Sequence, residues 1–161
     1  MTSVAFKNSR IFLVSSLRWK ILDILAIAVA NKWDLFQMDV KNVFLNGNLS
    51  EEVYMQPPPS LSVESNKVCH LWCALYGLKQ APRAWFAKFS STIFHLGYTT
   101  TPYDSAVFLR CTIKGTFLLL LYVNDIIITG DDLSGIQELK DFLSQQFEMK
   151  DLGHLSYCCC Q

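Results

Sequence analysis

Two polar residues, Asn124 and Asp125, interrupt the apolar run FLLLLYVNDIIITG. Such side chains are costly in an apolar interior, so they indicate either a turn or a site of chemistry. A further acidic residue, Asp39, lies near the end of the short segment LFQMDV. Carboxylates are the protein ligands that Mg²⁺ takes beside substrate phosphates, and two such ions support phosphoryl transfer. The pattern therefore has two interpretations, a plain turn or a metal site that includes Asp39.

A tight hairpin would place these residues at one edge of a sheet. The segments LLLLYV and IIIT flank the break and are predicted to pair as antiparallel strands. Asn124 and Asp125 suit a two-residue turn between them because both residues tolerate positive φ. If LFQMDV forms an adjacent strand, its end would bring Asp39 to the hairpin tip. That arrangement would gather three oxygen-bearing side chains at one point.

The remaining segments alternate between helical and extended patterns. Apolar residues recur at helical spacing in three places, separated by short extended runs. The predicted helices are 10–31, Pro82–Leu96 and a last one from Asp132 or Ser134 to Phe147, and the predicted strands are 35–40, 53–56, 68–72, 106–110, 116–123 and 126–129. These elements predict an α+β chain with short antiparallel strands and three helices.

The composition favours one intracellular domain that is not a free nucleic-acid binder. The chain has 161 residues, 51% of them hydrophobic, and 14 basic residues balance 14 acidic ones. Autonomous nucleic-acid-binding modules are usually basic. The apolar stretch ILDILAIAVA is about half the roughly 20 residues of a membrane-spanning helix, and the N-terminus lacks a signal-peptide pattern. Six cysteines without framework spacing indicate reduced thiols, so we expect an intracellular protein without a membrane partner.

Five sequence blocks carry a resemblance to a known family. They are QMDVKNVFLNGNLSEEVYMQPPP at 37–59, LYGLKQAPRAWF at 75–86, YDS at 103–105, LLLYVND at 119–125 and FEMKDLGHLSY at 147–157. In this order and spacing they resemble the reverse transcriptase of Ty1/copia-type LTR retrotransposons. The resemblance implies a palm-type antiparallel sheet packed by helices over 35–157, with incomplete fingers and no thumb. A divergent helical remnant of the fingers would precede it at 1–34, and a degenerate tail would follow at 158–161.

The resemblance also implies a reaction and its catalytic residues. In the family, a primer 3′-hydroxyl attacks the α-phosphate of a deoxynucleoside triphosphate, so that RNA is copied into DNA with two Mg²⁺ ions. Asp39 and Asp125 would be the catalytic, metal-binding carboxylates, and Asn124 stands where the family's YVDD box has its first aspartate. The implied partners are an RNA or DNA template-primer and deoxynucleoside triphosphates, and the implied location is a cytoplasmic particle or the nucleus.

Further residues match the substrate-binding positions of the family. Phe44 matches an aromatic gate whose ring fills the space that a 2′-hydroxyl would need, while Lys79 and Arg83 match phosphate-contacting positions. The alternatives are an ordinary core position for Phe44 and a solvated helix start for Lys79 and Arg83. The positions implied for nucleotide binding are Val40, Phe44, Tyr76, Gly77 and Lys79, and those implied for the template-primer are Gln80, Pro82, Arg83 and Tyr122.

Several departures from the family pattern predict weakened activity. Asn124 is neutral, so the site lacks one negative charge where two divalent cations are implied. Val43 replaces the usual alanine close to the nucleotide, where added volume is costly. Complete fingers, the thumb and RNase H are not recognisable in the sequence. We therefore expect a truncated and catalytically impaired reverse transcriptase or, alternatively, a non-catalytic palm fragment that binds nucleic acid or protein.

Overall fold

The computed structural model describes residues 4–6, 15–62, 64, 66–102, 104–155 and 157–159, with the backbone alone for 4–6, 15–19 and 157–159. Residues 10–14 of the first predicted helix, Tyr103 and Ser156 of the quoted sequence blocks, and residues 160–161 of the predicted tail lie outside this description. The chain divides into two compact units. Residues up to Lys41 together with those from Tyr98 onward form the first unit, and Asn42–Gly97 form the second.

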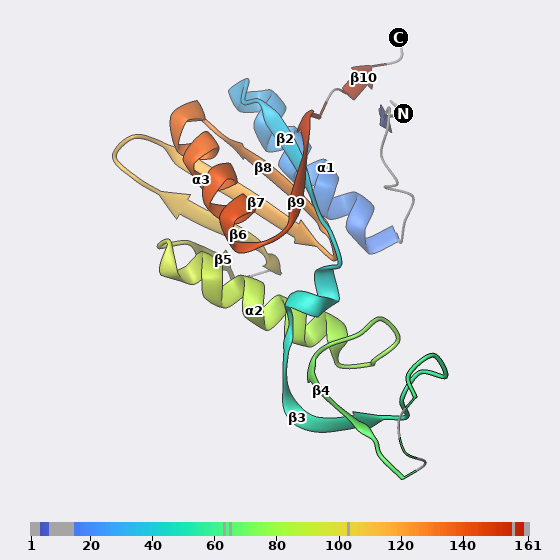
Figure 1. The fold of residues 1–161 in the computed structure, drawn as a ribbon. Helices are drawn as coiled ribbons and strands as arrows, with labels where there is room; N and C mark the ends of the chain where they lie inside the picture. Colours follow the sequence, from blue (N-terminus) through green and yellow to red (C-terminus); the bar gives the residue numbers. More distant parts are fainter. Residues whose placement is uncertain are drawn as a thin grey trace. The chain divides into compact units, whose positions relative to one another are not determined.

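The first unit is built on a six-stranded antiparallel sheet with the strand order β5-β6-β7-β8-β2-β9 (Figure 1). Strand β2 lies between β8 and β9, although both neighbours come about a hundred residues later in the chain. The strands are β5 Thr99–Thr101, β6 Asp104–Cys111, β7 Thr116–Tyr122, β8 Asp125–Gly130, β2 Leu35–Val40 and β9 Met149–His154, and a separate pair joins β1 Val4–Phe6 to β10 Tyr157–Cys159.

Two helices pack on opposite faces of this sheet (Figure 1). Helix α1 (Ser15–Asn31) buries a stripe at helical spacing against Leu35 of β2, Leu120 of β7 and Ile127 of β8. Helix α3 (Leu133–Gln146) lies over β8 and β9. The buried residues of the two stripes are Ile21, Ile24, Leu25 and Ala28 on α1 and Ile136, Leu139 and Leu143 on α3. The sheet is therefore covered on both sides, which explains why β7 and β8 are buried at nearly every position.

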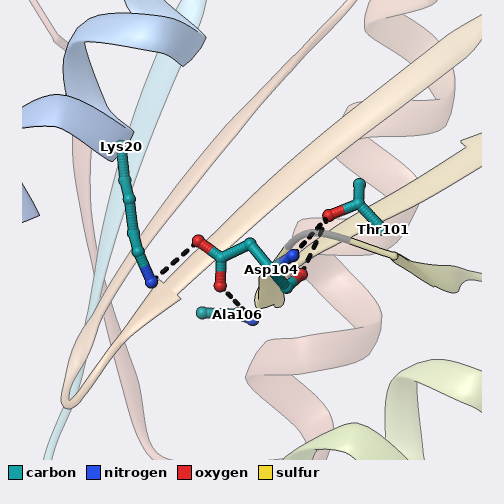
Figure 2. Close-up of polar contacts among 4 residues, drawn as sticks. All are labelled: Lys20, Thr101, Asp104 and Ala106. Carbon is teal, nitrogen blue, oxygen red and sulfur yellow. Dashed lines mark hydrogen bonds and ion pairs between the residues drawn. The ribbon is translucent and has the colours of Figure 1, made fainter.

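An ion pair ties α1 to the start of β6 (Figure 2). The Nζ atom of Lys20 lies 2.7 Å from Oδ2 of Asp104, while Oδ1 of Asp104 accepts a hydrogen bond from the Ala106 N–H at 2.9 Å. The Thr101 hydroxyl donates to the Asp104 carbonyl at 2.9 Å. Asp104, from the YDS block, therefore shapes the turn between β5 and β6 and anchors α1 over the sheet.

The second unit consists of a short 3₁₀-helix, an antiparallel ribbon and one helix. These elements are η1 Val43–Asn46, β3 Asn48–Met55, β4 Cys69–Cys73 and α2 Ala81–His95. Pro82 occupies the first turn of α2, where its missing N–H costs nothing, and Gly97 follows the helix with a φ of 81°. Gly47 leaves room for α2, because a Cβ there would approach the Trp85 nitrogen to 2.7 Å.

Most predicted elements are confirmed, and the differences lie mainly in the strands. The α+β class, the three helices and the antiparallel strands are all present, although β3 begins at Asn48 rather than at 53. Strands β1, β5, β9 and β10 and the 3₁₀-helix η1 are additional to the predicted elements. In β9 the segment MKDLGH alternates little and is exposed at four of its six positions. Within the described part of the chain, no helix is both long enough and apolar enough to cross a membrane.

The start of α3 provides a stability test. The Asp132 side chain accepts a hydrogen bond from the Gly135 N–H at 3.1 Å, so of the two predicted caps Asp132 is the one that the structure uses. We predict that Asp132→Ala lowers the free energy of unfolding by about 1 kcal/mol. Urea denaturation followed by circular dichroism measures this. The matched variant Ser134→Ala should change it by less than about 0.5 kcal/mol, and an equal loss in both variants would contradict the assignment.

Candidate active site

The hairpin between β7 and β8 turns one residue earlier than the sequence predicts. Tyr122 pairs directly with Asp125, so the two-residue loop is Val123–Asn124 and Asp125 already belongs to β8. The prediction that Asn124 and Asp125 form the turn with positive φ is therefore wrong. Positive φ instead falls on Val123, at 48°, a conformation that is uncommon for a β-branched residue. The continuous β7–β8 ladder imposes this strain, and it also fixes the direction in which the Asp125 side chain points.

Strand β2, which pairs with β8, places Asp39 beside Asp125. In the antiparallel ladder of β2 and β8, Asp39 lies directly opposite Asp125, so both side chains project from one face of the sheet. The Val40 N–H donates to the Asn124 carbonyl at 2.8 Å and closes the end of this ladder. Leu35 and Ile127 have the same orientation and pack against α1, so the carboxylates lie on the face that α1 partly covers.

Two side-chain amides engage the two carboxylates. Nδ2 of Asn124 donates a hydrogen bond to Oδ1 of Asp39, and Nε2 of Gln37 donates to Oδ1 of Asp125 at 3.0 Å. Gln37 is buried, whereas both aspartates are half-buried. Gln37 is not among the site residues that the sequence predicts. The signal that would have revealed it is its position two residues before Asp39, which places both side chains on the same face of a strand.

The carboxylate pair has an unfavourable electrostatic environment when no cation is bound. Burial raises the pKa of the Asp125 carboxyl, the hydrogen bond from Gln37 opposes this shift, and the charge of Asp39 raises the pKa further. A cation between the two carboxylates would offset both the burial of Asp125 and its repulsion by Asp39, because the cation's positive charge stabilises the ionised carboxylates.

The oxygen donors present are compatible with Mg²⁺. Asp39 and Asp125 supply two carboxylates from one face of the sheet, and Mg²⁺ commonly takes one or two carboxylates from protein when substrate phosphates complete its shell. Asn124 points an N–H donor at Asp39, and its amide oxygen would reach a cation only after the side-chain amide turned over. Among the described side chains, no group of three or more His, Cys, Asp or Glu residues gathers as a metal site.

Two other residues of the first unit that the resemblance implicates lie beside the carboxylates. Tyr122 is directly opposite Asp125 in the β7–β8 ladder and packs partly against the α1 core. The Val40 side chain is buried and, by strand alternation, points away from the face that carries Asp39. Val40 therefore touches the hairpin tip through its backbone.

The other implicated residues belong to the second unit. The rings of Phe44 and Tyr76 contact edge to face with centroids 4.6 Å apart, and Tyr76 is 63% exposed. Gly77 has a φ of 97°, which accounts for the glycine by conformation alone. Val43 is buried. The residues around the start of α2 are Lys79, Pro82 and Arg83, which are exposed, and Gln80, which is half-buried. This exposure is compatible both with phosphate contacts and with a solvated helix start.

Comparisons with known proteins agree with the sequence blocks. Residues 11–159 match the family described as reverse transcriptase (RNA-dependent DNA polymerase). The chain is 40% identical, over 83% of its length, to the retrovirus-related Pol polyprotein from transposon RE1 of Arabidopsis thaliana, and 44% identical, over 81%, to that from transposon TNT 1-94 of Nicotiana tabacum. It spans only 9% and 10% of these two polyproteins. A putative transposon Ty5-1 protein of Saccharomyces cerevisiae is 31% identical over 72% of the chain, which covers 38% of that protein. No solved structure matches the chain.

The raised pKa of Asp125 predicts a pH-dependent stability. Because the folded state holds this proton more tightly than the unfolded state, the contribution to stability is complete below the ordinary pKa and is lost as pH rises through the raised pKa. Relative to Asp125→Asn, the parent chain should therefore lose stability in urea denaturation as the pH rises above about 4, the ordinary pKa of an aspartate. Asp39→Asn, which removes one cause of the shift, should reduce this slope. A parent and an Asp125→Asn variant with parallel pH profiles would contradict the prediction.

Proposed function

The chain belongs to the reverse transcriptase (RNA-dependent DNA polymerase) family of retrotransposon Pol polyproteins, and from this premise we propose that residues 35–157 form its palm and part of its fingers. On this proposal 1–34 is a divergent fingers segment and 158–161 a degenerate tail. The reaction is the transfer of a deoxynucleotide to a primer 3′-hydroxyl, directed by an RNA template. The observation that carries the proposal is the cross-strand pairing of Asp39 with Asp125 beside a hairpin tip.

The roles of the site residues follow from the positions of their atoms. Asp39 and Asp125 would hold Mg²⁺ through carboxylate oxygens that point from one face of the sheet. When bound, Mg²⁺ supplies activation of the attacking oxygen and stabilisation of the leaving oxygen in phosphoryl transfer. Tyr122, opposite Asp125, would lie beside the primer end. The hairpin orients these groups in advance, because the β7–β8 ladder and the bond from Val40 to Asn124 fix its tip.

Asn124 is the reason to propose an impaired enzyme. Its amide is neutral and donates to Asp39, so it occupies one lone pair that a cation would otherwise take. The site then offers two negative charges where a third aspartate would offer three. Each 1.36 kcal/mol of lost transition-state stabilisation costs a factor of ten in rate, so a loss of a few kcal/mol slows the reaction on the order of hundreds-fold. The same hydrogen bond supports the second candidate, a non-catalytic palm fragment that binds nucleic acid or protein.

The second unit supplies the proposed substrate contacts. Phe44, backed edge to face by Tyr76, would fill the space that a ribose 2′-hydroxyl needs. The exposed cations Lys79 and Arg83 would contact phosphates, and Gly77 would allow the backbone to approach the nucleotide. Gln80 and Pro82, at the start of α2, would contact the template-primer.

Primer extension on an RNA template with Mg²⁺ tests the proposed function. We expect little product from the parent chain and a gain on the order of hundreds-fold from Asn124→Asp, because a third carboxylate restores both charge and coordination. Adding Asp39→Ala to the Asn124→Asp variant should abolish the gain. The control Asn48→Asp makes the same change of charge in the parent chain, at an exposed residue of β3, and should not increase extension. Efficient extension by the parent would disprove impairment. Failure of a folded Asn124→Asp chain would favour the non-catalytic candidate.

The aromatic pair has its own test in the Asn124→Asp background. If the Phe44 ring excludes the 2′-hydroxyl, Phe44→Ala should reduce the preference for deoxynucleotides over ribonucleotides by roughly tenfold or more, since one steric contact discriminates by about that factor. Competitive single-nucleotide incorporation measures this ratio. Phe94→Ala, which removes an exposed ring from α2, serves as the control and should leave the preference unchanged. An unchanged preference in Phe44→Ala would assign Phe44 to ordinary packing.

A further inference from the structure

Gln37 is a buried polar side chain in a position where the fold would otherwise place an apolar one. It is 6% exposed and lies on β2 between Leu35 and Asp39, on the face that α1 covers. Its cross-strand neighbour is the buried Ile127. An amide removed from water costs several kcal/mol unless it is hydrogen-bonded, so a leucine or methionine would be the cheaper residue here. A polar residue in this place calls for an explanation beyond packing.

The hydrogen-bond partner of the Gln37 amide, Asp125, supplies this explanation. Nε2 of Gln37 donates to Oδ1 of Asp125 at 3.0 Å, along the diagonal between the pairs Gln37–Ile127 and Asp39–Asp125. Carboxylates that face each other across an antiparallel ladder repel, and this repulsion favours rotation of the two side chains away from each other. The bond from Gln37 holds one oxygen of Asp125 in place. Oδ2 accepts no bond from Gln37 and is left for another ligand.

The chemistry of the donor also matters. A lysine or arginine in this place would hold Asp125 more strongly, but it would neutralise the charge that attracts a cation. An amide has no net charge, so it orients the carboxylate and leaves its negative charge in place.

We propose that Gln37 is a positioning residue, whose buried amide holds the Asp125 carboxylate beside that of Asp39 so that the pair can take one divalent cation. This inference rests on the proposed function for the identity of the ligand. The geometric part, the orientation of Asp125 by Gln37, stands independently of any metal and is tested separately.

The experiment compares the 161-residue chain with two variants of it. Gln37→Met keeps the volume and removes the donor. Thr129→Val removes a hydrogen bond of another buried side chain on the same face of the sheet, from the Thr129 hydroxyl to the Asp34 carbonyl at 2.8 Å, and leaves Asp125 untouched. The first readout is the χ1 rotamer of Asp125 from NMR three-bond couplings without metal. The second is the Mn²⁺ affinity from paramagnetic broadening of the amide signals of β2 and β8.

The inference predicts a single Asp125 rotamer in the parent and in Thr129→Val, and averaged couplings in Gln37→Met. It also predicts a Mn²⁺ affinity that falls about 10–100-fold in Gln37→Met, as for outer partners of metal ligands in general, and no more than about twofold in Thr129→Val. Unchanged couplings in a folded Gln37→Met chain would overturn the inference. So would an unchanged Mn²⁺ affinity. Averaged couplings in Gln37→Met together with no Mn²⁺ binding by the parent would uphold the positioning role and count against the proposed function instead.

Discussion

The register between β2 and β8 is the constraint on which the rest of the first unit depends. It sets Asp39 opposite Asp125, and a shift of one residue would send one of the two carboxylates to the other face of the sheet. The apolar neighbours hold this register, because Leu35 and Ile127 must face α1 while Met38 and Ile126 must face the other side. The packing of apolar side chains therefore places the carboxylates of Asp39 and Asp125 side by side.

The same register creates an electrostatic problem that the two amides reduce. Two half-buried carboxylates repel each other, and each accepts one N–H, from Asn124 on Asp39 and from Gln37 on Asp125. The two amides are not equivalent, however. Gln37 supports the pair from within the sheet, whereas Asn124 stands in the loop where the family's sequence block has an acidic residue. We propose that the hydrogen bond from Asn124 to Asp39 stabilises the metal-free site, and that the neutral Asn124 side chain makes the site weaker for a cation than a third aspartate would.

Sequence reasoning identified the features that depend on local pattern. The hairpin, the three helices and the convergence of Asp39 with the hairpin tip were predicted from apolar periodicity and from the break at Asn124. The buried role of Gln37 was not predicted, because Gln37 and Asp39 alternate with apolar residues, which is the pattern of a strand with one solvated face. Helix α1 covers that face, a tertiary effect that periodicity alone does not reveal. The sequence predicts the turn one residue too late, at Asn124–Asp125, because these residues tolerate positive φ. The β7–β8 ladder pairs Tyr122 with Asp125 instead, and positive φ falls on Val123, a β-branched residue that disfavours it.

The central claim is that Asp39 and Asp125 form a single cation site that Asn124 weakens. Anomalous X-ray diffraction from crystals of the parent chain and of Asn124→Asp, both grown with Mn²⁺, tests this claim most directly. The account predicts a Mn²⁺ peak bound by both carboxylates in Asn124→Asp, and a weaker peak at the same position in the parent. A fully occupied peak in both crystals would show that Asn124 does not impair the site. Carboxylates that point apart, with Mn²⁺ absent from Asn124→Asp, would contradict the site itself.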